Sequence, residues 1–181
     1  MKKLALLIII LFAVPACKSS KKASNKDKPR KVVVAPAPEK EVEESNTGED
    51  AEELEKADNI INTALAFRGT RYKYGGTTSK GMDCSGLIYV SFKEHSVPLQ
   101  RTSYMMAKQG KQIKLKEVKK GDLLFFNTNK SRKRINHVGL VVTVDKQGIK
   151  FIHATTSRGV LISSLKEGYW NYAFIEARRI L

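Results

Sequence analysis

Three residues of this chain have the types and the order along the sequence that nucleophilic catalysis requires. Cys84 lies in the polar, glycine-flanked stretch Gly81–Leu87, and His137 and His153 follow on segments with strand-like patterns. A cysteine attacks as its thiolate, and it needs a base whose ring is oriented by a third group. The three residues therefore indicate a cysteine nucleophile assisted by a histidine pair.

The sequence around Cys84 favours an activated thiol. A helix is expected over residues 84–95, and Asp83 as its N-terminal cap would place Cys84 in the first turn, where the helix dipole stabilises an anion. The alternative is a buried cysteine that packs as a small apolar residue. Polar neighbours on both sides favour the functional interpretation.

The two histidines flank a predicted β-hairpin. A three-residue loop, Lys146 to Gly148, would pair Val141 with His153 and place His137 on the same face, four residues away along the strand. A bulge, strand twist or an irregular strand start must then bring the two rings together.

The remaining histidine and a possible metal site need separate consideration. His95, late in the second expected helix, is predicted to face solvent near the helix C-terminus. Cys84, His137 and His153 are also zinc-ligand types, but their spacing contains no short-range ligand pair. Cysteine chemistry is the preferred interpretation, and we expect no metal and no cofactor.

The elements that must position these residues belong to one α+β domain, residues 51–181. An amphipathic helix is expected over residues 51–67, closed by Gly69. Its apolar stripe consists of Leu54, Ala57, Ile61, Ala64 and Leu65. After Gly121 the expected strands are 123–127, 138–144, 149–154, 160–163 and 172–178. Helices followed by strands indicate N-terminal helices packed on an antiparallel sheet.

The first 50 residues differ from the domain. An eleven-residue apolar run, Leu4–Val14, is too short to cross a bilayer, which needs about 20 residues, and it follows two lysines as in an export signal. The segment Val14–Cys17 resembles a bacterial lipobox, which implies removal of residues 1–16 and lipidation of Cys17. The alternative is an ordinary signal peptide that ends near a cysteine. Residues 17–50 contain no aromatic side chain and are predicted to form a disordered spacer.

Location and charge limit the expected partners. A lipidated Cys17 would tether the protein to a bacterial membrane outside the cytoplasm, with the periplasmic side of the outer membrane as the expected site. The formal net charge is +15, and the basic loop Lys130–Arg134 ends three residues before His137, so we expect it to border the mouth of the active site. This loop either grips an anionic wall or membrane surface or is simply solvated. Basic runs often bind nucleic acid, but an exported protein is not expected to meet it.

Several segments together resemble the NlpC-type cell-wall cysteine peptidases of the papain-like group. The matching segments are Gly69–Gly76, Asp83–Leu87, Gly121–Phe126, His137–Leu140 and Phe151–Ala154, in the family's order. The ending, from Tyr169 and Trp170 through Ala177–Leu181, also resembles that of the single-domain lipoprotein endopeptidases of this family. The similarity covers about residues 56–181. It implies a papain-like fold in which a helix carrying the nucleophile packs on an antiparallel sheet carrying both histidines.

The resemblance also implies roles for the matching residues. Cys84 is the implied nucleophile, His137 the general base and then acid, and His153 the residue that orients His137. Tyr72 matches a tyrosine whose hydroxyl helps to bind the oxyanion, with half-buried packing as the alternative.

Three further residues match positions of the family's substrate groove. Asp83 and Ser85 match positions that line it, although Asp83 is equally well explained as a helix cap, and Arg101 matches a position that faces acidic substrate groups. The implied substrates are peptidoglycan stem peptides, cut at the γ-D-glutamyl-diaminopimelate or the D-alanyl-diaminopimelate bond. The alternatives are a non-catalytic wall-binding lipoprotein and an amidase or acyltransferase with the same triad.

Overall fold

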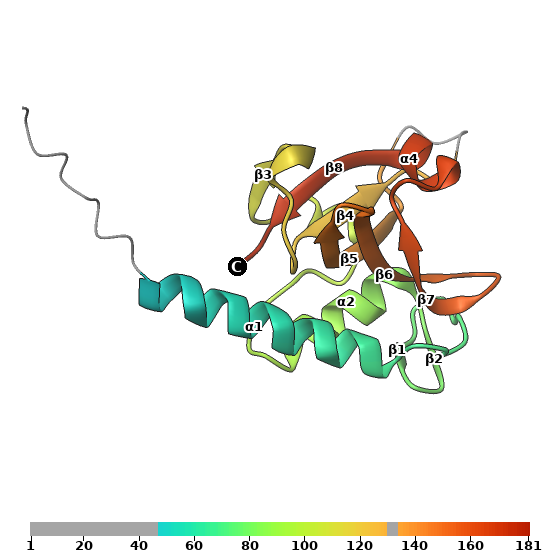
Figure 1. Ribbon diagram of the computed structural model, residues 1–181. Helices are drawn as coiled ribbons and strands as arrows, with labels where there is room; N and C mark the ends of the chain where they lie inside the picture. Colours follow the sequence, from blue (N-terminus) through green and yellow to red (C-terminus); the bar gives the residue numbers. More distant parts are fainter. Residues whose placement is uncertain (1–46, 130–133) are drawn as a thin grey trace, which may run out of the picture. The chain divides into compact units, whose positions relative to one another are not determined.

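The computed structural model of the chain describes residues 47–129 and 134–181 (Figure 1). Its helices are α1 (Thr47–Ala66), α2 (Cys84–Lys93), α3 (Ser103–Met106), the 3-10 helix η1 (Leu115–Glu117) and α4 (Gly168–Ala173). Its strands are β1 (Thr77–Thr78), β2 (Gly81–Met82), β3 (Lys111–Ile113), β4 (Leu123–Phe126), β5 (His137–Asp145), β6 (Gly148–Thr155), β7 (Gly159–Ser164) and β8 (Phe174–Arg179). Cys17, the predicted signal peptide, most of the predicted spacer and Lys130–Lys133 of the basic loop lie outside the described residues.

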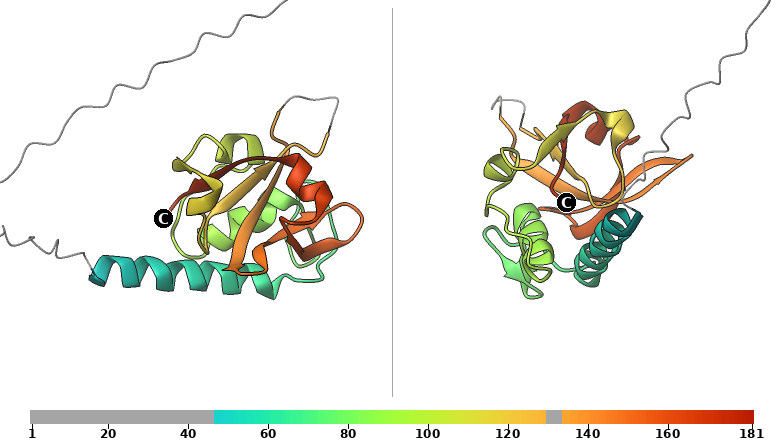
Figure 2. Two further views of the ribbon diagram at one scale, coloured as in Figure 1. Left: turned by 45° about the horizontal axis from the view of Figure 1, so that its top comes forward. Right: turned by 90° about the vertical axis from the view of Figure 1, so that its left-hand side faces the viewer.

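Six of the strands form one antiparallel sheet in the order β3-β8-β4-β5-β6-β7, and β1 and β2 form a small separate hairpin. Helices α1 and α2 lie together on one side of the large sheet, and α4 lies on the other (Figure 2). The predicted arrangement, helices packed on an antiparallel sheet, is therefore confirmed. None of the helices within the two described ranges has the length and apolar character that a membrane span needs.

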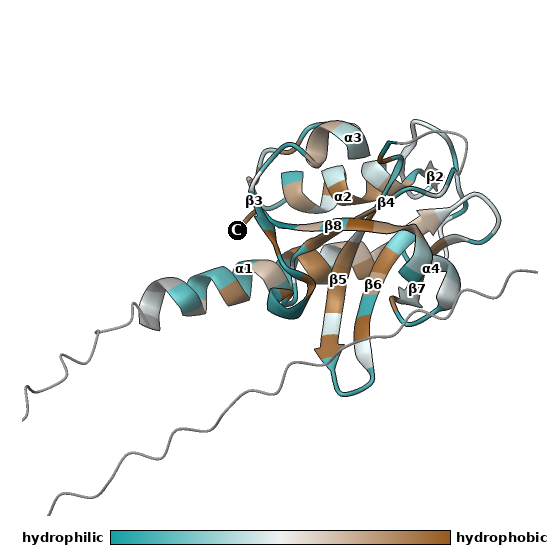
Figure 3. Cartoon of the chain, turned by 90° about the horizontal axis from the view of Figure 1, so that it is seen from above, coloured by the Kyte–Doolittle hydropathy of each residue, from teal (hydrophilic) through white to brown (hydrophobic). Residues whose placement is uncertain are grey.

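Both faces of the central strands are buried. On the helix side, Ile60 of α1 and Leu87 of α2 pack with Val138 of β5, whereas Val141 of β5 and Phe151 of β6 belong to a second cluster on the opposite face. Successive side chains of a strand alternate between faces, so β5 serves both clusters. Figure 3 shows the resulting concentration of apolar residues on α2 and the central strands.

The first helix differs in detail from its prediction. It begins at Thr47, so residues 47–50 of the predicted spacer are helical, and Asp50 in its first turn is favoured by the helix dipole. Leu54, assigned to the apolar stripe, is 52% exposed, whereas Ile60 is fully buried. The apolar face is thus rotated away from Leu54 and passes through Ile60.

The β5–β6 hairpin corrects the predicted register. Asp145 pairs with Gly148, so the turn has two residues rather than three, and the register shifts again at a bulge between Val141 and Thr143. Val141 consequently lies opposite Phe151 and not opposite His153. The shorter turn and the extra residue on β5 each bring His153 one residue closer to His137 along the ladder.

Two further boundaries differ. The predicted strand 172–178 begins at Phe174, because residues 168–173 form α4, and α2 ends at Lys93 rather than at residue 95. The short elements β1, β2, α3, β3 and η1 were not predicted, since each is too short to show a periodic apolar pattern.

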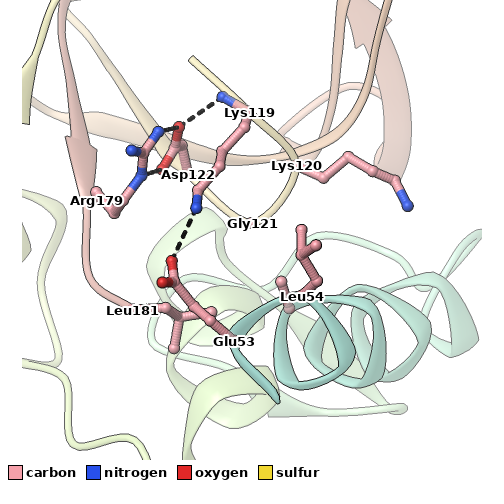
Figure 4. A pocket seen from close by; sticks show the side chains of 9 residues that line it. Glu53, Leu54, Lys119, Lys120, Gly121, Asp122, Arg179 and Leu181 are labelled. Carbon is pink, nitrogen blue, oxygen red and sulfur yellow. Dashed lines mark hydrogen bonds and ion pairs between the residues drawn. The ribbon is translucent and has the colours of Figure 1, made fainter. Parts of the chain in front are cut away.

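An ion-pair network ties the first helix to the last strand (Figure 4). Buried Asp122 accepts hydrogen bonds from the Nε and Nη2 atoms of Arg179 at 2.9 Å each and from the backbone N–H of Lys119 at 2.7 Å. The Lys119 ammonium in turn lies 3.0 Å from Glu53 of α1. The network therefore connects α1, the turn before β4 and β8.

Asp122→Ala is expected to lower the free energy of unfolding by about 2–3 kcal/mol, because it leaves a partly buried guanidinium and a backbone N–H without their acceptor. Urea denaturation of the full chain measures this change. Glu53→Gln is the matched control, since its ion pair is more exposed and should contribute about 0–1 kcal/mol. Equal effects of the two substitutions would contradict a special role for Asp122.

Candidate active site

The N-terminus of α2 presents Cys84. Asp83 is the N-cap, and its carboxylate accepts a hydrogen bond from the Gly86 N–H at 2.6 Å, as the sequence predicts. Gly86 is needed there because a Cβ atom would overlap the carbonyl oxygen of Gly76. Cys84 is consequently the first residue of the helix.

The sulfur of Cys84 is placed beside the start of β5. It lies close to the backbone N–H of Val138, the residue that follows His137, and the thiol is only 8% exposed. Burial raises the pKa of the thiol to about 11, while the N–H groups of Val138, Ser85 and Cys84 act in the opposite direction. The helix terminus thus favours the thiolate, as expected, but burial outweighs it, and the resting thiol keeps its proton.

His137 and His153 form a hydrogen-bonded pair. The Nε2 atom of His137 lies 2.9 Å from Nδ1 of His153, and His153 is fully buried. Continuing the observed register places His153 opposite Gly139, two residues from His137 instead of four. With Nε2 facing His153, Nδ1 is the second ring nitrogen of His137, and the next residue, Val138, directs its N–H to the Cys84 sulfur.

Burial also keeps both rings neutral. It lowers the pKa of His137 to about 4, and it lowers the pKa of His153 further, with smaller contributions from His137 and Arg158. The two facing nitrogens, Nε2 of His137 and Nδ1 of His153, therefore form a hydrogen bond between two neutral rings. Within the two described ranges, no group of three or more His, Cys, Asp or Glu residues is arranged to hold a metal.

Aromatic side chains enclose the histidine pair. Trp170 of α4 stacks on His137, with ring centroids 5.2 Å apart and an interplanar angle of 25°, and it meets His153 edge-on at 4.5 Å. Phe126 lies 5.9 Å from His137, and Phe151 lies 4.8 Å from His153. These rings exclude water from the hydrogen bond, which strengthens its electrostatic component.

A groove of about 700 Å³ opens in front of Cys84. Tyr72, Asp83, Ser85 and Arg101, all singled out from the sequence, line it together with Cys84. Burial and the nearby Cys84 and Asp83 raise the pKa of Tyr72, so its hydroxyl remains a hydrogen-bond donor at neutral pH.

One wall of the groove is a compact polar cluster. The Arg101 guanidinium forms a bidentate pair with the Asp83 carboxylate, at 3.1 and 3.2 Å, and donates to the Ser85 hydroxyl at 2.9 Å. Asp83 also accepts from the N–H groups of Gly75 and Gly86. Asp83 therefore caps the helix and holds Arg101, whose charge is already partnered within the protein.

Sequence reasoning missed some residues of the site and found others. Exposed Arg134 lines the groove, as expected for the end of the basic loop. Trp170 and Ser163 were not assigned to the site: Trp170 was noted only as part of an ending that resembles the family, Ser163 has no local signature of chemistry, and only the fold brings the two residues to the histidines. His95 was predicted to face solvent. In the structure it is only partly exposed, and its Nε2 atom lies 2.9 Å from the Thr63 hydroxyl of α1.

A helix that begins at a cysteine, packed against strands that carry a hydrogen-bonded histidine pair, defines a papain-like α+β domain. The NlpC/P60 family model matches residues 69–179, and the chain belongs to this family. The fold and family implied by the sequence are both confirmed.

Named relatives and a solved structure are similar to this chain. The murein DD-endopeptidase MepS/murein LD-carboxypeptidase of Escherichia coli K12 is 37% identical over 123 residues, which cover 67% of this chain and 62% of that protein. The gamma-D-glutamyl-L-lysine dipeptidyl-peptidase of Bacillus subtilis is 36% identical, covering 68% and 40% respectively. An NlpC/P60 family crystal structure from Bacillus cereus has a TM-score of 0.63 at 31% identity, covering 69% of this chain and 40% of that one. The chain thus spans less than two thirds of these relatives.

Proposed function

We propose that the protein is a peptidoglycan endopeptidase that hydrolyses amide bonds of stem peptides through Cys84, with His137 as general base and His153 as its orienting partner. The hydrogen-bonded histidine pair carries this proposal: the Nε2 atom of His137 faces His153, and the Cys84 sulfur lies at the N–H of Val138, the residue that follows His137. In the proposed arrangement, the free Nδ1 atom of His137 serves the thiol. The names of the relatives, a murein endopeptidase and a glutamyl-lysine peptidase, support peptidoglycan as the substrate class.

The acylation step follows from the neutral resting pair. As the sulfur of Cys84 attacks the amide carbon, its proton passes to Nδ1 of His137, which becomes an imidazolium. The carbonyl oxygen becomes an oxyanion, and the Cys84 N–H and the Tyr72 hydroxyl are its proposed donors. His137 then protonates the leaving amine, the C–N bond breaks, and a thioester remains on Cys84.

Deacylation uses the same groups, with water as the nucleophile and the Cys84 sulfur as the leaving group. His137, neutral again, takes a proton from a water molecule whose oxygen attacks the thioester carbon. The C–S bond breaks, the acid product leaves, and His137 returns the proton to Cys84. The cycle requires no cofactor.

The groove suits a substrate with carboxylates near the cleaved bond. Arg134 lines it and is exposed, and the Asp83–Ser85–Arg101 cluster forms a fixed polar wall. We propose that this wall orients the stem peptide. Because Arg101 is paired with Asp83, we propose that it fixes the positions of Asp83 and Ser85 as well as supplying positive charge to the groove.

Arg101→Gln is expected to lower kcat/KM about tenfold, mainly through KM, since the loss of a charge-assisted hydrogen bond is typically about 1.5–3 kcal/mol and part of it is recovered by solvent here. Steady-state kinetics on a purified stem peptide measure the effect. Arg101→Lys tests geometry, because lysine keeps the charge without the bidentate fork. A lysine variant equal to the wild type would show that charge alone matters.

Digestion of purified peptidoglycan with the full chain, followed by mass spectrometry of the released fragments, tests the proposed activity. Fragments cut within the stem peptides support it, and their masses distinguish the γ-D-glutamyl-diaminopimelate bond from the D-alanyl-diaminopimelate bond. Cleavage only between muramic acid and the first residue would instead indicate an amidase. Tight binding without any fragments would indicate a non-catalytic wall-binding lipoprotein.

We also propose that residues 1–16 are removed and that lipidated Cys17 tethers the protein to a bacterial membrane, on the periplasmic side of the outer membrane. The short apolar run and the lipobox-like Val14–Cys17 support this location. Two or more acyl chains hold a protein stably, whereas one chain binds only marginally. The mass of the N-terminal peptide and fractionation of a Cys17→Ser variant test it, and an unmodified Cys17 in the wild type would refute it.

A further inference from the structure

The hydrogen-bonded chain of the active site does not end at the second histidine. The Nε2 atom of His153 lies 3.0 Å from the Oγ atom of Ser163 on β7, and Ser163 is only 3% exposed. On the neighbouring strand Phe151 pairs with Ser163, which sets the hydroxyl diagonally beside His153 on the same face of the sheet. The order of contacts is therefore His137, His153, Ser163, from the thiol inward.

The proposed reaction permits one direction of hydrogen bonding along this chain. When His137 holds a proton on both ring nitrogens, its Nε2–H must donate to Nδ1 of His153. A neutral His153 then carries its single proton on Nε2, and that N–H needs an acceptor. The opposite tautomer of His153 would donate from Nδ1 to His137, leaving the proton of neutral His137 on Nδ1, where it cannot receive the proton of the thiol.

Ser163 is the acceptor that this direction requires. A hydroxyl accepts while directing its own hydrogen elsewhere, whereas a backbone N–H at the same place would enforce the unproductive tautomer. Water is a poor substitute, because Trp170 and Phe151 close the space around His153. Removing the hydroxyl would leave a buried N–H unpaired each time His137 becomes charged.

We infer that Ser163 is a positioning residue of the reaction: its hydroxyl accepts from the Nε2–H of His153 and so stabilises the tautomer in which Nδ1 of His137 can accept the thiol proton. This inference rests on the proposed function for its role in catalysis, but the tautomer itself is a property of the free protein. Ser163 does not line the substrate groove, so its effect is separable from binding.

The test compares Ser163→Ala, Ser163→Thr and the control Ser164→Ala in the full chain. Ser164 is the next residue on β7, and its hydroxyl accepts from the Lys166 N–H, away from the histidines. Ser163→Ala is expected to lower kcat about 10- to 100-fold with little change in KM, because a buried N–H of His153 is left without its acceptor when His137 is charged. Ser163→Thr, which keeps the hydroxyl, is expected to recover most of the loss, and Ser164→Ala to behave as the wild type.

Two readouts separate positioning from mere structural damage. The acid limb of kcat/KM should move to lower pH in Ser163→Ala, because protonated His137 loses support through His153; the other charged group acting on His153, Arg158, is unchanged in all variants. Nitrogen-15 NMR of the substrate-free protein should show His153 protonated on Nε2 in the wild type and a tautomer mixture in Ser163→Ala.

The outcomes distinguish this inference from the proposed function. Wild-type protein that releases no wall fragments would refute the function, and the NMR tautomer would still test the positioning. His153 protonated on Nδ1 in the wild type, or Ser163→Ala with a kcat equal to that of Ser164→Ala, would overturn the inference. If Ser163→Ala fails to fold, Ser163→Thr and the tautomer of His153 in the wild type test the inference instead. A folded Ser163→Thr variant that loses kcat while its acid limb stays at the wild-type pH would also overturn the inference.

Discussion

Cys84→Ala should abolish hydrolysis of peptidoglycan while leaving the fold intact. The sulfur is the atom that would form the thioester, so without it only binding and the oxyanion donors remain, and kcat is expected to fall by about 10⁴-fold or more. The side chain is small and sits at a helix terminus, so the free energy of unfolding should change by about 1 kcal/mol or less. Release of soluble fragments from purified wall measures the activity, and urea denaturation measures the stability.

Two further variants make this prediction specific. Cys84→Ser preserves shape and hydrogen bonding, but a serine hydroxyl is a far weaker nucleophile beside a neutral imidazole, so it should be nearly as inactive as alanine. Cys17→Ala is the matched control, because it removes the other cysteine of the sequence, which lies outside the segment that matches the family, and it should keep full activity on soluble fragments. Hydrolysis by Cys84→Ser at the wild-type rate would remove the thiol from the mechanism.

The sequence predicts this site well where a residue's chemistry is expressed locally. Asp83 before Cys84 predicts the helix start, because a capping side chain acts on the very next turn. The strands that carry His137 and His153 are visible as β-type runs, because their burial on both faces demands continuous apolar residues. These features depend on neighbours within a few positions.

Features of the site that depend on contacts between distant residues could not be predicted from the sequence. The offset between His137 and His153 is decided by turn length and a bulge, which differ by one residue each and leave the apolar pattern nearly unchanged. Trp170 looks like any core aromatic until α4 folds across the sheet. Ser163 is one of many serines, and its meaning comes only from the atom that it faces.

Protonation states belong to the same class of feature. The helix dipole, which a sequence pattern can indicate, favours a thiolate at Cys84, but the burial that opposes it comes from residues across the whole domain. The sequence pattern predicts an ionised thiol at Cys84, whereas its burial in the structure raises the pKa and favours the protonated form. This change alters the pH dependence that the enzyme should show.

His137→Gln should lower kcat by about 10³- to 10⁴-fold and remove the acid limb from the pH profile. Glutamine keeps a polar group near His153 but cannot accept the thiol proton or pass it to the leaving amine. Burial lowers the pKa of His137 to about 4, so in the wild type the neutral base persists as the pH falls through 6.5 and is lost only near pH 4. Burial also raises the pKa of the thiol to about 11, which places the alkaline limb far above neutrality.

The measurement is kcat/KM on a soluble stem peptide from about pH 3 to 11, with apparent pKa values that belong to the coupled pair rather than to either residue alone. The matched control is His95→Gln, which removes a histidine that is bonded to Thr63 and should leave both limbs of the pH profile unchanged. A wild-type acid limb near 6.5 would mean that water reaches the imidazole of His137 despite the cover of Trp170. An acid limb near 4 requires that cover, because only exclusion of water makes the charged ring so unfavourable.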